Sequence, residues 1–500
     1  MTTKEALEKY AALEKTLFAL GHAESMLYYD GATVAPKGSA GVRASTLGEL
    51  SRLTYQFATS PETIEVVGTL AADLDSLDAV TRRKVTENVR DLERMRRVPE
   101  DIFVEYTELS AKADAVWHDA KEKNDFASFE PYLQKMFDMT KLVRSCEEPG
   151  KDPYDTALDD HERGLDRATC DAFFAGLREK LVPLINEVKE HADRVDDTPL
   201  KRRFPIEKQR KFSDFVMGLM DIDPNHCVLG ETEHPFTIDF SRDDVRITTH
   251  YHENAFASSM YSVIHEGGHA LYELHTGREL AGTELGEGAS MAIHESQSRF
   301  YENVIGRSRE FCSLIYPWLK AEFAPNLDDV SEDDFYRMIN KSEPSLIRTE
   351  ADELTYCMHV LVRYELEKRM FNGELKAKEL PAEWNRLYKE YLGVDVPDDR
   401  RGVLQDSHWS NGNIGYFPTY AIGSAYGGQY IERINRDFDL FAAVRDGDFA
   451  RINGWLEEHI WKHGRMLDPV PLFESVCGKF DVNYYVAYLE KKFRDVYRLG

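Results

Sequence analysis

The segment at residues 265–269, which reads HEGGH, restricts the possible folds and functions of this chain more than any other feature of its sequence. If the segment is helical, His265 and His269 lie one turn apart on the same face, so both imidazoles can reach one metal ion. Glu266 then lies beside that ion, where its carboxylate can accept a proton from a water molecule. The spacing therefore predicts a metal centre on a helix, with Glu266 as its general base.

Two adjacent glycines, Gly267 and Gly268, occupy the middle of this motif. Each glycine inside a helix costs about 1 kcal/mol relative to alanine. Such a pair is expected where a packed neighbour or a substrate backbone approaches the helix closely. The glycines therefore favour a metal site over a pair of surface or core histidines.

A third ligand has to come from outside the motif, and His275 is the nearest histidine that follows it. It stands at the spacing that some zinc proteases use, but those proteases require a glycine turn three residues after the second histidine. Here that position is Tyr272, and Leu271 and Leu274 continue the helical pattern. The helix is therefore expected to carry His275 away from the metal.

Three carboxylates further along the chain are the alternatives, because zinc is well held by two neutral imidazoles and one carboxylate, with water in the fourth position. Glu284 and Glu287 lie in a glycine-rich connection at residues 282–288, where rigid placement is difficult. Glu295 lies in residues 290–304, whose apolar positions fit a second helix. We favour Glu295, which makes this a zinc centre built between two helices.

Most of the remaining chain is predicted to be helical. Apolar residues recur at helical spacing over residues 7–20, and Thr2 and Glu5 are expected to form a capping box in front of them. Residues 236–240 and 245–251 instead alternate with the period of a strand, around a turn at 241–244. They predict a β-hairpin just before the metal helix, whose edge can pair with an extended peptide.

The composition excludes several classes of protein. Because 62 Lys and Arg residues face 89 Asp and Glu residues, the formal net charge is −27, which argues against a nucleic-acid partner. No apolar run approaches the roughly 20 residues of a membrane-spanning helix, and the N-terminus lacks the order of a secretory signal. The 6 cysteines form no CxxC pair. We therefore expect a cytoplasmic protein that binds neither nucleic acid nor a membrane.

Further motifs lie before and after HEGGH along the chain. They are HPF at 234–236, DVRIT at 244–248, HESQ at 294–297, IRTEAD at 347–352, GVLQDSHW at 402–409 and GYFPTY at 415–420. In order and spacing these blocks resemble the carboxypeptidase Taq family of metallocarboxypeptidases. The stretch from Tyr29 to Arg43 is also similar, although the family usually has a tryptophan at the position of Tyr29. The resemblance spans nearly the whole chain.

This resemblance implies a mainly α-helical fold, with a single peptidase domain over residues 1–500, a deep active-site groove and a small antiparallel β-hairpin or sheet beside the zinc helix. The amino-terminal helices, about residues 1–120, are expected to cover the groove in part, and the catalytic core is expected at about residues 200–430. The family typically forms homodimers and uses one zinc ion per chain, which cobalt often replaces. It removes single residues from peptide carboxyl termini with broad preference.

The resemblance also implies roles for individual residues. The expected metal ligands are His265, His269 and Glu295; the expected catalytic residues are Glu266, His408 and Tyr420; and the expected substrate-binding residues are Arg348 and His234. A guanidinium suits the recognition of a chain end, because it stays charged and can grip a carboxylate with two hydrogen bonds. His408 and Tyr420 are candidate donors to the developing oxyanion.

A few matched residues are expected to act through others. Asp244 and Arg246 are expected to fix the hairpin against the zinc helix, and Gln405 and Asp406 to orient His408. Trp409 is expected in the core.

Two rival functions remain on the sequence alone. An endo-acting oligopeptidase or a dipeptidase on the same scaffold would differ in the distance between the carboxylate anchor and the metal. A helical binding protein that keeps zinc as a structural staple would lack Glu266 or Arg348, and both are present.

Overall fold

The computed structural model describes residues 1–499, and these residues form a mainly α-helical fold, as predicted. The helices are α1 (Thr3–Thr33), α2 (Ala40–Ala58), α3 (Pro61–Ala71), α4 (Ala79–Arg97), α5 (Glu100–Lys123), α6 (Phe126–Glu147), α7 (Pro153–His161), α8 (Arg167–Glu190), α9 (Ile206–Leu219), α10 (Phe256–Leu274), α11 (Met291–Arg299), α12 (Arg309–Glu322), α13 (Glu332–Ile339), α14 (Tyr356–Phe371), α15 (Leu380–Leu392), α16 (Phe417–Ile434), α17 (Leu440–Asp446), α18 (Phe449–His459), α19 (Pro469–Cys477) and α20 (Val482–Tyr497). The strands are β1 (Cys227–Glu231), β2 (Thr237–Ser241) and β3 (Asp244–Thr249).

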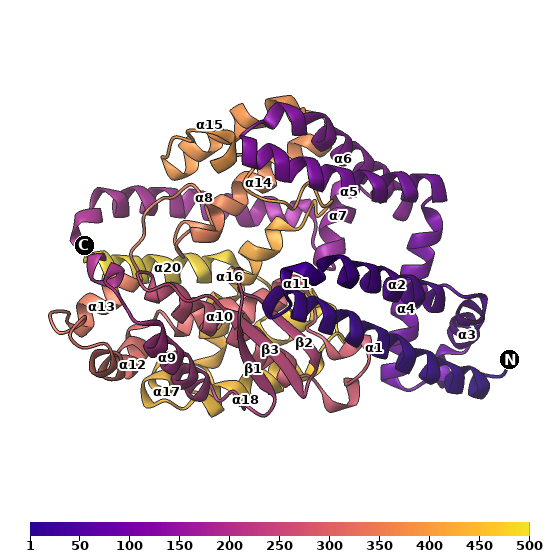
Figure 1. Ribbon diagram of the computed structural model, residues 1–500, viewed down its shortest axis with the longest axis horizontal. Coiled ribbons are helices and arrows are strands. Elements are labelled where there is room, and N and C mark those ends of the chain that lie inside the picture. The colour runs from indigo at the N-terminus through magenta and orange to yellow at the C-terminus, as the bar shows by residue number, and fades with distance from the viewer. Residues whose placement is uncertain (500) are drawn as a thin grey trace.

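The helices surround a central group made of α10, α11 and α16 (Figure 1). In this view α5, α6, α14 and α15 lie above that group, and α9, α12, α17 and α18 lie below it with the sheet. The α1–α2 hairpin lies at the right, beside β2. Its first helix begins with the predicted capping box, in which Thr2 Oγ1 accepts from the Glu5 backbone N–H and the Glu5 carboxylate accepts from the Thr2 N–H.

Two hydrophobic cores support this arrangement. The larger one runs from α5 to α20 and includes the buried faces of α10, α11 and α16. A much smaller one joins α1, α3 and α4 through Ala6, Tyr10, Val66, Leu70 and Val85. Throughout residues 1–499, every helix is either too short or too polar to cross a membrane.

The three strands form one small sheet, in the order β1-β3-β2. β2 pairs antiparallel with β3, with Thr237 opposite Ile247, which confirms the predicted hairpin. β1 was not predicted; it pairs parallel with β3 and leaves β2 at the edge. The sheet packs on α10, so the hairpin lies beside the metal helix as expected.

The role expected for Arg246 needs a correction. Its guanidinium forms an ion pair with Asp244 at 2.9 Å and lies over the rings of Tyr29 in α1 and Phe240 in β2, at 5.0 and 4.4 Å from their centroids. These contacts attach α1 to the outer face of the sheet, whereas we expected them to fix the hairpin against the zinc helix. On the opposite face of β3, Val245 and Ile247 are fully buried.

The contact between α10 and α11 depends on Gly268. A Cβ at this position would lie 2.7 Å from the Ser298 Cα and 2.8 Å from the Gln297 carbonyl oxygen. These are backbone atoms of α11, so the two helices touch main chain to main chain. On its other side α11 meets α16 in the same way, because a Cβ at Gly423 would lie 2.8 Å from the Ala292 carbonyl oxygen. The expectation that a packed neighbour explains the motif glycines is confirmed at Gly268.

The helix predicted over residues 290–304 is divided in the structure. α11 ends at Arg299, and the segment Phe300–Ile305 continues as a π-helix. Such a wide turn is rare, and it often occurs near functional sites. Here it contains Glu302, which faces the predicted metal ligands.

We expect Gly268→Ala to lower the free energy of unfolding by about 1–3 kcal/mol, although alanine is the better helix former, because the new methyl group has to push two backbones apart. The matched control is Gly454→Ala in α18, where no atom lies within 4 Å of the added Cβ. That variant is expected to gain about 0.5–1 kcal/mol. Thermal unfolding of both variants measures the two changes in stability. An equal gain in stability in Gly268→Ala and Gly454→Ala would contradict the close contact between α10 and α11.

Candidate active site

The structure brings together the three side chains that were predicted as metal ligands. One donor atom from each of His265, His269 and Glu295 lies within 4.8 Å of the others. The Glu295 Oε2 atom is 3.9 Å from His265 Nε2 and 3.7 Å from His269 Nε2. Two imidazoles and a carboxylate are a donor set that suits zinc and leaves room for a fourth ligand. His275 is not part of the group, because its Nδ1 atom contacts the Leu271 carbonyl oxygen at 2.8 Å.

Each histidine of the group is oriented through its other ring nitrogen. His265 Nδ1 contacts Glu302 Oε2 at 2.9 Å. His269 Nδ1 contacts His294 Nδ1 at 2.5 Å, and His294 Nε2 contacts Glu273 Oε1 at 2.6 Å. If His269 donates to His294 and His294 donates to Glu273, both ligand histidines keep an unprotonated Nε2 for the metal.

The carboxylates near the ligands are balanced by arginines. Arg299 donates from Nε to Glu295 Oε1 at 2.7 Å and from Nη1 to Glu302 Oε2 at 3.1 Å. Arg307 donates to the other oxygen of Glu302 at 3.3 Å. Burial alone would raise the pKa of Glu302, but Arg299 and His265 hold it well below the usual carboxyl range. Glu302 is therefore an ionised acceptor that fixes the His265 ring.

Glu266, the predicted general base, is almost completely buried beside the ligand group. Its Oε2 atom accepts from the Thr237 hydroxyl at 2.6 Å, so the edge strand β2 fixes its side chain. Burial raises the pKa of Glu266, although His265 and Thr237 act in the opposite direction. A raised pKa suits a carboxylate that takes up and returns a proton near neutral pH.

Arg348 begins a short 3-10 turn, and its own side chain is buried and held by two other side chains. Its Nε and Nη2 atoms donate to Asp406 Oδ1 at 3.1 and 2.9 Å, and its Nη1 atom donates to the Tyr356 hydroxyl at 3.2 Å. A guanidinium has five N–H groups, so these contacts leave two of them for another acceptor. Arg348 is therefore held in place by the fold and still able to bind a carboxylate.

Asp406 and Gln405 support Arg348, which corrects the expectation that they orient His408. Asp406 Oδ2 accepts from Arg363 Nε at 2.7 Å, so one carboxylate serves two guanidiniums. Gln405 Oε1 accepts from the Arg348 backbone N–H at 3.0 Å. Burial alone would raise the pKa of Asp406, but Arg363 and Arg348 hold it well below its usual range.

His408 and Tyr420 form a pair next to Arg348, with His408 Nε2 at 3.2 Å from the Tyr420 hydroxyl. Burial and Arg348 lower the pKa of His408 to about 3, so its ring is neutral. Its buried Nδ1 atom has no hydrogen-bond partner within residues 1–499, which favours the tautomer that donates from Nε2 to the tyrosine oxygen. The Tyr420 proton is then free to donate elsewhere. Burial raises the pKa of Tyr420, so the phenol keeps that proton.

Two other predicted residues have different surroundings. His234 is exposed in the bend before β2 and makes no hydrogen bond to any described residue, so its proposed contact with substrate stays a prediction. Trp409 is in the core as expected, and its indole N–H donates to the buried Glu367 at 2.7 Å.

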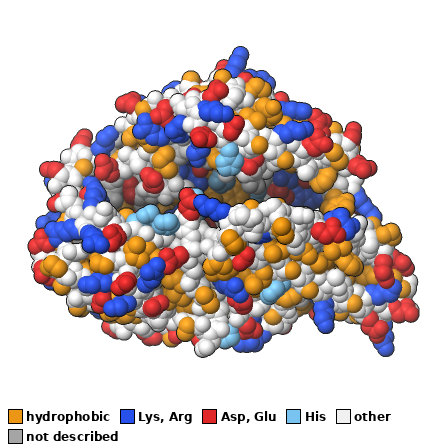
Figure 2. Space-filling model, in the orientation of Figure 1, with side chains coloured by type: hydrophobic (Ala, Val, Ile, Leu, Met, Phe, Trp, Pro, Cys, Tyr) orange, Lys and Arg blue, Asp and Glu red, His pale blue; other side chains and the backbone are white. Residues whose placement is uncertain are grey.

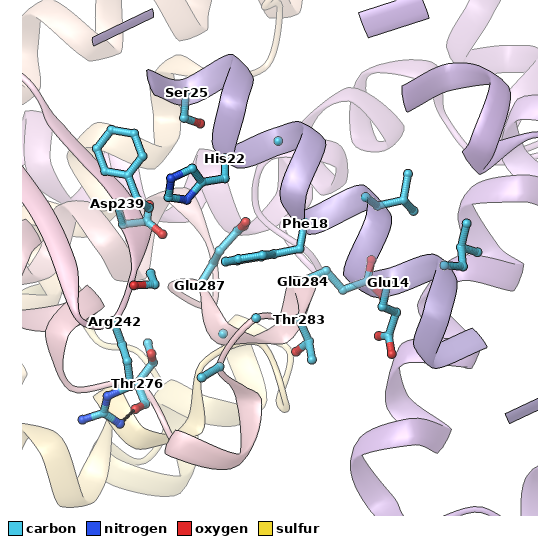
Figure 3. A pocket seen from close by; sticks show the side chains of 18 of the residues that line it. Glu14, Phe18, His22, Ser25, Asp239, Arg242, Thr276, Thr283, Glu284 and Glu287 are labelled. Atoms are coloured by element: carbon cyan, nitrogen blue, oxygen red, sulfur yellow. Dashed lines mark hydrogen bonds between the residues drawn. The ribbon is translucent and has the colours of Figure 1, made fainter. Parts of the chain in front are cut away.

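A hollow crosses this face of the molecule between the upper and lower helices, with histidine and basic side chains on its walls (Figure 2). A cavity of about 390 Å³ lies between α1 and the edge strand β2. Phe18 and His22 of α1 line one side, and Asp239, Glu284 and Glu287 line the other (Figure 3). Burial and the nearby acids raise the pKa of Asp239 to about 7. Glu284 and Glu287, the rejected ligand candidates, thus line this cavity and lie outside the group of three ligands.

The sequence analysis did not predict several residues that contact the site. They are Thr237, Glu273, Arg299, Glu302 and Tyr356. Helical spacing could have indicated three of them. Glu273 follows His269 by four residues, and Arg299 and Glu302 follow Glu295 by four and seven, so each lies on the face of its helix that carries a ligand. Thr237 and Tyr356 had no such signal, because their partners are distant in the sequence or on another element.

Known proteins match this chain over almost its whole length. The profile of the family described as "Carboxypeptidase Taq (M32) metallopeptidase" matches residues 9–493. Carboxypeptidase 1 of Bacillus subtilis (strain 168) is 37% identical over 494 residues, which cover 98% of this chain and 99% of that protein. Thermostable carboxypeptidase 1 of Pyrococcus furiosus is 36% identical over 496 residues, covering 98% of each chain. The crystal structure of the M32 carboxypeptidase from Deinococcus radiodurans R1 is similar with a TM-score of 0.95 at 34% identity, covering 99% of this chain and 100% of that one.

We expect Asp406→Asn to destabilise the fold by about 3–5 kcal/mol, because it leaves two buried guanidiniums without a counter-charge. The native carboxylate has a lowered pKa, so its contribution is fully present above the unfolded-state pKa of about 4 and is lost only as the pH falls through the lower folded-state value. The deficit of the variant is therefore expected to be constant between about pH 6 and pH 8. Thermal unfolding across this range measures it. Glu390→Gln, which breaks an exposed pair with Arg386, is the control and should change little.

Proposed function

Because the chain belongs to the carboxypeptidase Taq (M32) family of metallopeptidases, and is therefore a metallocarboxypeptidase, we propose that it uses zinc to release single amino acids, with broad preference, from the carboxyl ends of peptides. One observation supports this proposal above the others. A three-ligand group with Glu266 beside it lies in the same active site as a buried arginine that keeps two N–H groups free.

The family implies a divalent metal, and the side chains present here fit zinc. His265, His269 and Glu295 would hold the ion, and the partners Glu302 and His294 already present the two imidazoles by their Nε2 atoms. When bound, the ion supplies a Lewis acid that lowers the pKa of a water molecule and polarises a carbonyl group. Cobalt is expected to replace zinc, because it accepts the same donors.

Glu266 moves the proton in the proposed reaction. Its Oε1 atom, which does not accept from Thr237, takes a proton from the attacking water, while the Thr237 hydroxyl holds Oε2 in place. The same carboxyl group then returns the proton to the amine of the departing amino acid. Tyr420 donates its free hydroxyl proton to the developing oxyanion, and His408 fixes the phenol by donating to its oxygen.

Arg348 binds the terminal carboxylate of the peptide through its two remaining N–H groups. The residues upstream of the cut bond extend along the edge strand β2, whose outer side has no neighbouring strand within residues 1–499. His234, in the bend that leads into β2, donates to a carbonyl of that extended segment. Recognition of the chain end together with backbone pairing accounts for the broad preference for peptides, because neither contact involves a side chain of the peptide.

Two further properties follow from the resemblance to the family and from the composition. We propose that the protein is a homodimer and that it acts in the cytoplasm. Light scattering tests the first, because a mass equal to that of one chain contradicts it. Fractionation of cells tests the second.

We expect Glu266→Gln to keep its metal and to lose turnover by about 10²–10⁴-fold, because only the proton acceptor is removed. The variant retains the hydrogen bond from Thr237 through its amide oxygen. Metal content by mass spectrometry and kcat on a short peptide give the two measurements. Normal turnover would exclude Glu266 as the base, and loss of metal would mean that it has a structural role.

We expect the wild type to shorten free-acid peptides one residue at a time, to leave their amidated twins intact and to stop when a zinc chelator is added. Arg348→Lys is expected to raise KM for the free acids by tenfold or more, since an ammonium keeps the charge but loses the planar fork. Mass spectrometry of matched peptide pairs reads both results. Arg401→Lys, at an exposed pair with Asp398, is the control. Internal cleavage, or equal cutting of the amides, would favour the endo-acting alternative.

A further inference from the structure

Glu162 is a buried carboxylate that contacts the helix of the third metal ligand from a distant part of the chain. It lies just after α7, and its residue is only 1% exposed. Oε1 accepts from the Ser290 hydroxyl at 2.9 Å, and Oε2 accepts from the Ala292 backbone N–H at 2.9 Å. Both partners belong to the start of α11, about 130 residues further along the sequence.

These contacts complete the N-terminus of α11. The first backbone N–H groups of a helix have no partner inside it and need one from elsewhere. Ser290 is the N-cap and accepts from the Ile293 N–H at 3.1 Å, while its own hydroxyl proton goes to Glu162. Glu162 takes the Ala292 N–H. The first turn therefore depends on a side chain that the helix does not itself supply.

Within residues 1–499, no cation forms an ion pair with this carboxylate. Its hydrogen-bond partners are the neutral Ser290 and Ala292, and the titratable groups that face it are the phenols of Tyr272 and Tyr426, which are neutral. Burial raises the pKa of Glu162 to about 7, although its two donors act in the opposite direction. The favourable interaction that remains is with the helix N-terminus, where the peptide dipoles of α11 present positive charge.

Other contacts hold α11 further along its length, such as the hydrogen bond from the Trp461 indole N–H to Gln297 Oε1 at 2.9 Å. Gly268 of α10 and Gly423 of α16 let the neighbouring backbones close on it, which fixes its distance from both helices. The carboxylate of Glu162 acts at a different place, because it holds the first turn of the helix. Ala292 is three residues before Glu295, so the pinned point is about 4.5 Å along the axis from the ligand.

We propose that Glu162 is a positioning residue for the metal centre: it pins the first turn of α11 and so sets where the carboxylate of Glu295 meets the two histidines. The proposal rests on the proposed function only in taking Glu295 as a metal ligand. Removing the pin leaves all three ligands in the chain but misplaces one of them. Weaker metal binding is therefore the direct consequence, and slower turnover follows from it.

The test is zinc affinity, measured on metal-free protein at pH 8 by competition with a chromophoric chelator. Loss of a partner outside the ligand shell typically weakens metal binding by about 10–100-fold, and we expect at least tenfold for Glu162→Ala. Glu162→Asp keeps the charge but is too short to reach both donors, so it is expected to show a similar loss. Glu162→Gln keeps the length and an acceptor oxygen for Ala292, and is expected to stay within about threefold of the wild type.

Asp166→Ala is the matched control. Asp166 is also a carboxylate cap, accepting from the Thr169 N–H at 2.8 Å, but it starts α8, which carries none of the three ligands. Zinc affinity should be unchanged in this variant although its thermal stability falls. The absorption spectrum of the cobalt-loaded proteins gives a second measurement, because it reports the geometry of the ligands.

Wild-type zinc affinity in Glu162→Ala, an equal loss in Glu162→Gln or an equal loss in Asp166→Ala would each overturn the proposal. If Glu162→Ala does not fold, Glu162→Asp and Glu162→Gln decide the question between them. A wild type that binds no zinc would refute the proposed function itself, which separates that failure from a failure of the role given to Glu162.

Discussion

The contact between the backbones of α10 and α11 at Gly268 is the constraint on which the rest of the site depends. Two helices normally pack about 8–10 Å apart, because side chains separate them. Without a side chain at this position, α11 comes close enough for Glu295 to reach the histidines of α10. The close approach of the two helices also lets Glu302 and His294 contact the ligand histidines. Thr237 completes the site by its hydrogen bond to Glu266.

Much of the fold and the three proposed ligands could be predicted from local pattern. The HEGGH spacing, the helix that carries Glu295 and the hairpin alternation are all properties of short segments, and the structure has each of them. β1 was missed because it is only five residues long and contains a glycine and a glutamate. It is stabilised by pairing with β3, which its own sequence does not reveal.

The error over Asp406 has a different cause. Its position two residues before His408 suggested that one supports the other. The structure pairs it instead with Arg348 and Arg363, at separations of 58 and 43 residues. A buried charge takes the counter-charge that the tertiary fold brings to it, and closeness in sequence gives little information about which one that is. Buried ionic pairs were accordingly the least predictable part of the site.

The three hydrogen bonds that hold Arg348 have a thermodynamic consequence. A mobile arginine side chain carries about 2 kcal/mol of rotamer entropy, and this entropy is lost when the arginine binds an acceptor. Here that entropy is lost when the chain folds, before any peptide arrives. If Arg348 binds a terminal carboxylate, as we propose, no peptide has to meet that entropic cost on binding. Under that proposal, binding would depend on the free carboxyl end of a peptide more than on the side chains beside it.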